Sequence, residues 1–228
     1  MSDGANYMSF KDRLNRIIDE KHFAYWGIMG AVIGFVFILS ATIGYVGRSG
    51  EPYSMLNHFI SELGELGVSH LAWLFNLGLI LAGFVFLPFL IGLGLYIENK
   101  IAKIALVFGI ISAIAIILVG FFPMNYLLPH YLAAMTFFFG GMITVAVFTI
   151  AIFFQEDAKI PKTFIIPGLI TIFTFIYFLF FIDVGDLSTI FTSRPDILLI
   201  AIFEWVVYFA IIGYMLLVAV YVFLKERK

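Results

Sequence analysis

Residues 101–122 read IAKIALVFGIISAIAIILVGFF, and Lys103 is the only charged residue in this run. A helix that crosses the hydrocarbon core of a bilayer needs about 20 consecutive apolar residues. The run is long enough, and a helix that is apolar on all sides belongs in a protein core or in a membrane. The stretch therefore predicts a transmembrane helix.

Five further segments have the same length and character. The six predicted spans are residues 23–46, 71–97, 101–122, 130–155, 162–183 and 197–224. Only ENKIAK separates the second span from the third and only EDAKIPK the fourth from the fifth, so each of these pairs is predicted to form a helical hairpin. We expect an all-α, polytopic six-helix transmembrane bundle, with the transmembrane domain at 23–224, an N-terminal segment at 1–22 and a tail at 225–228.

Composition supports a membrane protein. The chain has 228 residues, of which 63% are hydrophobic and 12% charged, and its mean hydropathy is +1.08. Soluble domains average roughly 45–50% apolar and about 25% charged residues. The absence of cysteine excludes disulfides and thiolate metal sites and, with abundant Ile and Phe, is also typical of thermophilic proteins. A net charge of −2 gives no basis for binding nucleic acid.

The basic residues predict the orientation in the membrane. Eleven of the thirteen lysines and arginines fall in the N-terminal segment, the second and fourth loops and the C-terminal tail. The other two are Arg48 and Arg194, in the first and fifth loops. Short cytoplasmic loops carry an excess of Lys and Arg. Both termini are therefore expected in the cytoplasm of a multi-pass protein of the cell membrane, with the first, third and fifth loops outside.

The first span is expected to be retained, because no small-residue cleavage site follows its apolar run. It also contains Gly30 and Gly34, a G-x-x-x-G pair that lets membrane helices approach closely. Such a pair serves packing within one bundle, contacts in a homo-oligomer or contacts in a larger membrane complex. The sequence favours packing within the chain, and contacts in a homo-oligomer or in a larger membrane complex stay open as alternatives.

The first outer loop is unusually polar for so apolar a chain. Residues 57–70 read NHFISELGELGVSH. Across the longer stretch 53–67 the apolar residues recur at helical spacing. The polar residues on the opposite face are Asn57, His58, Ser61, Glu62 and Glu65. We expect an amphipathic helix in this loop. Its polar face is acidic, so attraction to anionic lipid does not explain it, and we expect it to cover the mouth of the bundle.

Polar residues also enter the outer halves of the spans. With the sixth helix expected to begin near Asp196, Glu204 lies about 12 Å along it at 1.5 Å per residue. Asn76 lies in the second span, His130 opens the fourth and Asp183 closes the fifth. Because a charged group in the membrane is costly unless it faces the protein interior, these side chains are expected to converge inside the bundle.

Four short motifs, in the order NHFISELG, LFNLGLILAG, GFFPMNYLLPHYLAA and FEWVVYF, resemble the membrane family called domain of unknown function 998. The resemblance covers residues 25–220 and implies the same six-helix layout. The family's characteristic polar positions correspond here to Asn57, Ser61, Glu62, Asn76, His130 and Glu204. A more distant likeness to the Frag1/DRAM/Sfk1 group of lipid-linked membrane proteins rests on the residue pair IS in the first outer loop. Neither resemblance implies a reaction.

The histidines and carboxylates of the chain also raise the question of a metal or cofactor site. His58, His70 and His130 with nearby carboxylates have the ligand types of a catalytic zinc, but none of them forms an H-x-x-x-H pair on one helix, so no metal site is expected. A haem would need two histidines on facing helices, and only His130 lies in a predicted span, so no haem is expected. The inner halves of the spans are too apolar to form a conducting path, so a channel is not expected either. No cofactor is identified by the sequence.

The favoured hypothesis is an outward-facing polar pocket that binds membrane lipids or a lipid-linked molecule and, in its stronger form, modifies it. Glu204 would be the buried acid or base, assisted by His130 and Glu62. The ligand would be oriented by Asn57, Ser61, Asn76 and Arg194. The alternative is a non-catalytic accessory or assembly subunit, in which these polar groups are a hydrogen-bonded clasp between helices. Whether the protein is an enzyme stays open.

Overall fold

The computed structural model describes residue 19, residues 22–182 and residues 193–227. Within them the chain is helical and contains no strand. The elements are α2 (Phe23–Ile43), the 3-10 helix η1 (Ile60–Gly64), α3 (Ala72–Tyr96), α4 (Lys100–Phe121), α5 (Leu127–Phe153), the 3-10 helix η2 (Lys162–Phe164), α6 (Ile165–Phe180) and α8 (Leu199–Glu226).

The expected all-helical protein with six apolar helices is confirmed. Six helices are long and apolar enough to cross a membrane, with η2 and α6 together forming the fifth. Their ends lie within three residues of the expected positions. The expected end of the fifth span at 183 and nearly all of the 1–22 segment lie outside the described residues.

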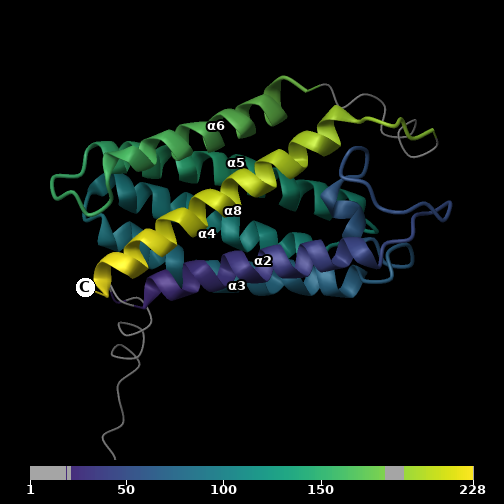
Figure 1. Cartoon of the computed structure of the whole chain (residues 1–228), viewed down its shortest axis with the longest axis horizontal. Helices are drawn as coiled ribbons and strands as arrows, with labels where there is room; N and C mark the ends of the chain where they lie inside the picture. Colours follow the sequence, from purple (N-terminus) through teal and green to yellow (C-terminus); the bar gives the residue numbers. More distant parts are fainter. Residues whose placement is uncertain (1–18, 20–21, 183–192, 228) are drawn as a thin grey trace, which may run out of the picture.

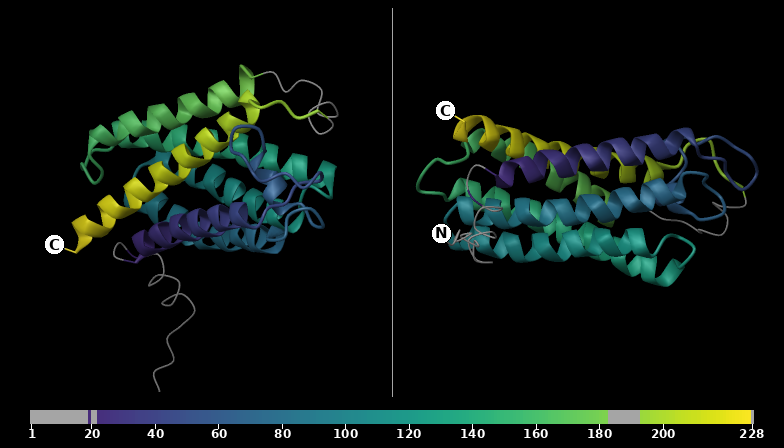
Figure 2. Two further views of the ribbon diagram at one scale, coloured as in Figure 1. Left: turned by 45° about the vertical axis from the view of Figure 1, so that its right-hand side comes forward. Right: turned by 90° about the horizontal axis from the view of Figure 1, so that it is seen from below.

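The six long helices lie roughly along one direction (Figure 1). Their main contacts follow a closed order, from α2 to α3, α4, α5, α6 and α8 and back to α2. Figure 2 shows the same bundle turned by 45° and seen from below. The helices therefore surround a central space, and side chains fill most of it.

Apolar side chains face both the inside and the outside of the bundle. Large buried residues such as Phe89, Phe148 and Phe175 pack in the interior, whereas Val32, Ile104 and Phe173 are among many exposed apolar residues on the outer surfaces. A soluble protein would bury such surfaces or replace them with polar ones. Apolar residues all around each helix are what a lipid environment requires.

One end of the bundle is covered by a long loop, residues 44–71, which we call the covering loop. It joins α2 to α3 and contains η1. We call this end of the bundle the η1 end, and the described end of α8 at the chain terminus lies at the opposite end (Figure 1). The expected amphipathic helix is shorter than predicted: only Ile60–Gly64 is helical, as a 3-10 turn, and the flanking residues form turns.

Close packing of η1 against α3 explains why the covering loop is not a longer helix. A Cβ at Gly64 would lie 2.5 Å from Asn76 Oδ1 and 2.7 Å from Phe75 Cδ1, so only glycine fits there. Gly67 follows with φ +85°, a left-handed conformation that glycine adopts without strain. The two glycines end the helical turn and let the chain descend into α3.

Candidate functional site

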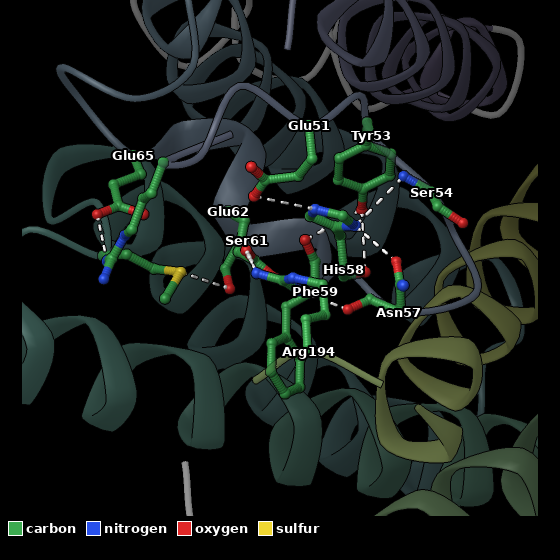
Figure 3. A network of polar contacts seen from close by, with 12 residues as sticks. Glu51, Tyr53, Ser54, Asn57, His58, Phe59, Ser61, Glu62, Glu65 and Arg194 are labelled. Atoms are coloured by element: carbon green, nitrogen blue, oxygen red, sulfur yellow. Dashed lines mark hydrogen bonds and ion pairs between the residues drawn. The ribbon is translucent and has the colours of Figure 1, made fainter. Parts of the chain in front are cut away.

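The covering loop is held down by a buried ion pair between Glu62 in η1 and Arg194, just before α8 (Figure 3). Arg194 Nη2 donates to Glu62 Oε2 at 2.6 Å and Nη1 to Oε1 at 3.0 Å. Oε1 also accepts the backbone N–H of Phe59 at 2.8 Å, and Oε2 the Tyr45 hydroxyl at 3.3 Å. Only 2% of the Glu62 side chain is exposed. A two-point Arg–carboxylate contact in so buried a place fixes both partners.

Further bonds join the covering loop to the segment that precedes α8. Arg194 Nη1 donates to the Asn57 carbonyl at 2.5 Å, and Asn57 Nδ2 donates to the Pro195 carbonyl at 2.9 Å. The Leu198 N–H donates to the Leu56 carbonyl at 2.8 Å. We call these bonds, together with the Glu62–Arg194 pair, the outer clamp. It connects parts of the chain more than a hundred residues apart.

Aromatic residues surround His58 beneath the outer clamp. The rings of Tyr45 and Tyr53 lie with their centroids 5.3 and 5.1 Å from that of His58. The Tyr53 hydroxyl donates to the carbonyls of His58 and Phe59 at 3.2 and 3.0 Å and accepts the Trp205 Nε1–H at 3.0 Å. These contacts tie the covering loop to α8 a second time.

His58 itself is enclosed. Its Nδ1 accepts the Ser54 backbone N–H at 3.3 Å and lies 2.8 Å from Asn57 Oδ1. Its Nε2 is buried without a hydrogen-bond partner among the described residues, and Glu51 Oε1 lies 3.9 Å away. Burial lowers the pKa of His58, although the Glu62 carboxylate acts in the opposite direction.

Below η1 lies a central cavity of about 140 Å³. Its walls come from α2, α3, α4, α5 and α8, and its roof includes Ile60 and Ser61 of η1. Most lining residues are apolar. The polar residues that line it are Ser61, Ser112, His130, Thr144, Glu204 and Tyr208. The cavity is thus an apolar space with its titratable groups in the part nearest η1.

Glu204 links the roof of the cavity to α8. Its Oε2 accepts the Ile60 backbone N–H at 2.7 Å. The residue is half-buried and lines the cavity. It lies five residues into α8, about 8 Å along the helix, because the helix begins at Leu199 and not near Asp196 as expected. No Lys, Arg or His of the described part of the chain forms an ion pair with it.

His130 reaches the same cavity from the first turns of α5. Its Nδ1 lies 2.8 Å from the carbonyl oxygen of Phe122, so Nδ1–H is the donor and Nε2 is the acceptor of the neutral ring. Phe122 directly follows α4, and this bond therefore sets the ring by the α4–α5 turn. No described side chain bonds to Nε2.

Two other predicted residues hold η1 in place. Asn76 Nδ2 donates to the Gly64 carbonyl at 3.0 Å, and its buried Oδ1 has no partner among the described residues. Ser61 Oγ donates to Met124 Sδ at 3.2 Å. Asn125 pairs with Leu66 through its Oδ1 and Nδ2, at 2.8 and 2.9 Å from the backbone N and O. These contacts attach the covering loop to α3 and to the α4–α5 turn.

The residues predicted as one site therefore divide into two groups. Asn57, Glu62 and Arg194 form the outer clamp, where they bind one another. Ser61, His130 and Glu204 line the cavity, and Asn76 supports η1 from α3. Tyr45, Tyr53 and Tyr208 were not predicted as site residues, because a tyrosine in an apolar chain gives no signal of its own. His58 was predicted to be an ordinary loop histidine, but it is buried between the rings of Tyr45 and Tyr53.

Metal ligands do not gather in the described residues, where no three His, Asp or Glu side chains lie close enough together to hold an ion. His58 lies beneath the outer clamp, His130 lies at the cavity and His70 is exposed. The histidines considered as a zinc set are therefore in three different environments.

A family model described as a protein of unknown function, DUF998, matches residues 29–221. The match begins in α2 and ends in α8, so it takes in all six long helices. No curated protein and no solved structure matches the chain. The four motifs that suggested the family all lie inside the matched region, and that resemblance is confirmed. The more distant likeness to the Frag1/DRAM/Sfk1 group stays a prediction. This multi-pass membrane protein belongs to the DUF998 family.

Proposed function

We propose that the protein binds an amphiphile, either a membrane lipid or a lipid-linked molecule, in the central cavity beneath η1. The apolar part of the ligand would occupy the cavity, and its polar group would meet Glu204 and His130. The observation that carries the proposal is an apolar cavity with two titratable side chains that have bonding capacity to spare. Apolar pockets with a few convergent polar groups are the usual form of a small-molecule site.

The size of the cavity limits how much of a ligand it holds. An engineered apolar cavity of about 150 Å³ binds benzene and stays free of water. A cavity of about 140 Å³ accordingly accepts one ring or a short alkyl segment, and the rest of a longer lipid would lie outside it. The covering loop would control access from the η1 end, because η1 forms the roof.

The outer clamp is proposed to hold the loop and not to react. Both oxygens of Glu62 already accept hydrogen bonds from Arg194, and each accepts a second one from Phe59 N or Tyr45 OH. A carboxylate with these contacts has no lone pair directed at a ligand. The acid–base role predicted for Glu62 is therefore not part of the proposal, whereas Glu204 and His130 keep theirs.

The fully hydrogen-bonded outer clamp favours a second candidate function, that of an accessory or assembly subunit. A tightly satisfied clamp on one face of the bundle is what a rigid docking surface needs. In that case Glu204 would serve only to hold Ile60 in η1. The two functions differ in whether the cavity takes up a ligand.

Orientation belongs to the proposal as well. At the η1 end Arg48 and Arg194 pair with Glu65 and Glu62. At the opposite end the described helix ends and loops carry Lys100, Lys103, Lys159, Lys162, Lys225 and Arg227. By the positive-inside rule that basic end faces the cytoplasm of the cell and the η1 end faces outward.

A matched pair of glycine variants tests the cavity. Gly34 lines it, and a Cβ there meets nothing closer than 3.5 Å, so Gly34→Leu places a side chain in the cavity. Gly213 is exposed on α8 with nothing within 4 Å of a Cβ, so Gly213→Leu makes the same change outside it. Native mass spectrometry of the purified proteins would show which molecules stay bound.

The proposal predicts a bound amphiphile on the wild type and on Gly213→Leu, and its loss from Gly34→Leu. If Gly34→Leu keeps the same bound molecule, that molecule lies elsewhere and the cavity is not the site. If the wild type binds nothing when offered a membrane extract, the accessory function is favoured.

A further inference from the structure

We propose that the amphiphile bound in the central cavity has an amine as its polar group, and that its ammonium group pairs with Glu204. This inference rests on the proposed function and names the ligand for the same site.

The Glu204 carboxyl group has bonding capacity left for a cation. Glu204 is the acidic residue of the cavity lining, and the only hydrogen bond that the structure gives it is from the Ile60 N–H to Oε2. Oε1 has no partner among the described residues. Charges placed away from water are normally paired. A ligand cation would complete the pair, and the result is the same whether the carboxylate receives an ammonium ion or the carboxylic acid protonates an amine.

Two further residues of the same cavity lining, His130 and Tyr208, have acceptor atoms to spare. His130 Nε2 is an acceptor in the neutral ring, because Nδ1–H is directed to Phe122 O. Tyr208 lies four residues after Glu204, one turn along the same face of α8. Its hydroxyl is buried, and no described group bonds to it. A primary ammonium has three N–H donors and no acceptor. Glu204 Oε1, His130 Nε2 and the Tyr208 hydroxyl oxygen therefore match its donors in number.

Ser112 and Thr144, the other polar residues of α4 and α5 that line the cavity, add no free hydrogen-bond donor to it. Ser112 Oγ donates to the Phe137 carbonyl at 3.1 Å and Thr144 Oγ1 to the Gly140 carbonyl at 2.6 Å. The hydroxyl hydrogen of Ser112 is therefore used between α4 and α5, and that of Thr144 within α5. Neither is available to donate to an anionic head group.

The described lining of the cavity has no basic side chain that would pair with an anionic ligand. The lining contains no Lys or Arg, and the Arg194 guanidinium is directed at Glu62 and the Asn57 carbonyl. A phosphate or carboxylate ligand would lose its water and meet Glu204 without compensation. Aromatic rings, including Phe75, Phe86 and Phe137, line the walls and favour an organic cation over an anion.

Three probes with the same six-carbon chain separate the alternatives: n-hexylamine, 1-hexanol and hexanoate. Their dissociation constants would be obtained from the shift in unfolding temperature of the full-length protein in a non-ionic detergent. The proteins compared are the wild type, Glu204→Gln and Glu156→Gln, which removes one exposed acidic group at the opposite end. The last variant controls for changes in net charge.

The expected result is a dissociation constant for hexylamine that is about tenfold or more below that of hexanol, as a charge-assisted bond provides. Hexanoate should bind still more weakly. Glu204→Gln should remove the advantage of the amine over the alcohol, and Glu156→Gln should keep it.

The inference is overturned if hexanoate binds as well as the amine, if amine and alcohol bind equally to the wild type, or if Glu204→Gln leaves the advantage unchanged. It is also overturned if no probe binds. In that last case the Gly34→Leu comparison still decides the proposed function separately, since a retained amphiphile lost from that variant would show an occupied cavity with a different head-group preference.

Discussion

At the scale of single residues, Glu62 and Glu204 differ in how many hydrogen bonds their carboxyl groups accept, and this difference gives them different roles. Glu62 is surrounded by donors and holds an arginine, whereas Glu204 has one backbone donor and faces a cavity. Both were predicted as site residues because both are polar residues in an apolar chain. Which carboxyl group has free bonding capacity depends on the position of Arg194 in space, and spacing along the sequence does not give that position.

His58 provides a prediction about pH. Burial lowers the pKa of His58, so the folded protein holds this proton less tightly than the unfolded chain, whose histidine pKa is about 6.5. Protonation therefore favours unfolding: the stability is complete above about pH 6.5 and falls as the pH drops below it. Unfolding temperatures between about pH 8 and pH 5.5 would measure the effect.

Two substitutions show whether His58 causes the loss of stability in acid. His58→Gln should show a smaller loss of unfolding temperature between those pH values than the wild type. His70→Gln, which changes an exposed histidine, should behave like the wild type. An unchanged pH dependence in His58→Gln would mean that other groups destabilise the protein in acid.

At the scale of elements, the covering loop is the part that sequence patterns describe least well. Helical spacing over 53–67 predicted a helix, but the structure has a 3-10 turn of five residues at Ile60–Gly64. The long spans were predictable because apolar runs of that length have few alternatives. The loop was not, because its shape depends on contacts with Asn76, Asn125 and Arg194, which come from three distant segments.

Removing the arginine tests the outer clamp as an element. Arg194→Gln should lower the free energy of unfolding by about 3 kcal/mol or more, because it leaves the buried Glu62 carboxylate without its cation. Hydrogen exchange should rise across residues 53–62 and stay unchanged in the turn between α3 and α4. Thermal unfolding and exchange mass spectrometry provide the two measurements.

Arg48→Gln is the matched control. It breaks another Arg–Glu pair in the same loop, but 53% of the Arg48 side chain is exposed, so the loss should be at most about 1 kcal/mol. Equal effects of the two substitutions would show that the Glu62–Arg194 pair does not hold the covering loop.

At the scale of the whole molecule, the closed order of helix contacts matters most. Six helices in a ring leave a central space, and small residues such as Gly34 and Ala113 on its lining keep part of it empty. The sequence predicted the number of spans, and of the residues expected to converge inside the bundle, Glu204 and His130 line the cavity whereas Asn76 does not. The sequence did not predict the cavity, because an empty volume depends on how side chains from five helices pack together.

Orientation is also a property of the whole molecule, and the absence of native cysteine makes it simple to test. Single-cysteine variants His70→Cys and Asp157→Cys place one thiol at each end of the bundle, both at exposed positions. A membrane-impermeant maleimide added to intact cells should label position 70 and not position 157. The reverse pattern would contradict the proposed orientation.

Photolabelling with a short alkyl diazirine, followed by peptide mapping, tests occupation of the central cavity most directly. The account predicts labelling of cavity-lining residues such as Leu79, Ile116 and Ile211, and loss of that labelling in Gly34→Leu but not in Gly213→Leu. Labelling confined to outward-facing residues such as Phe84 and Leu217, or unaffected by Gly34→Leu, would contradict it.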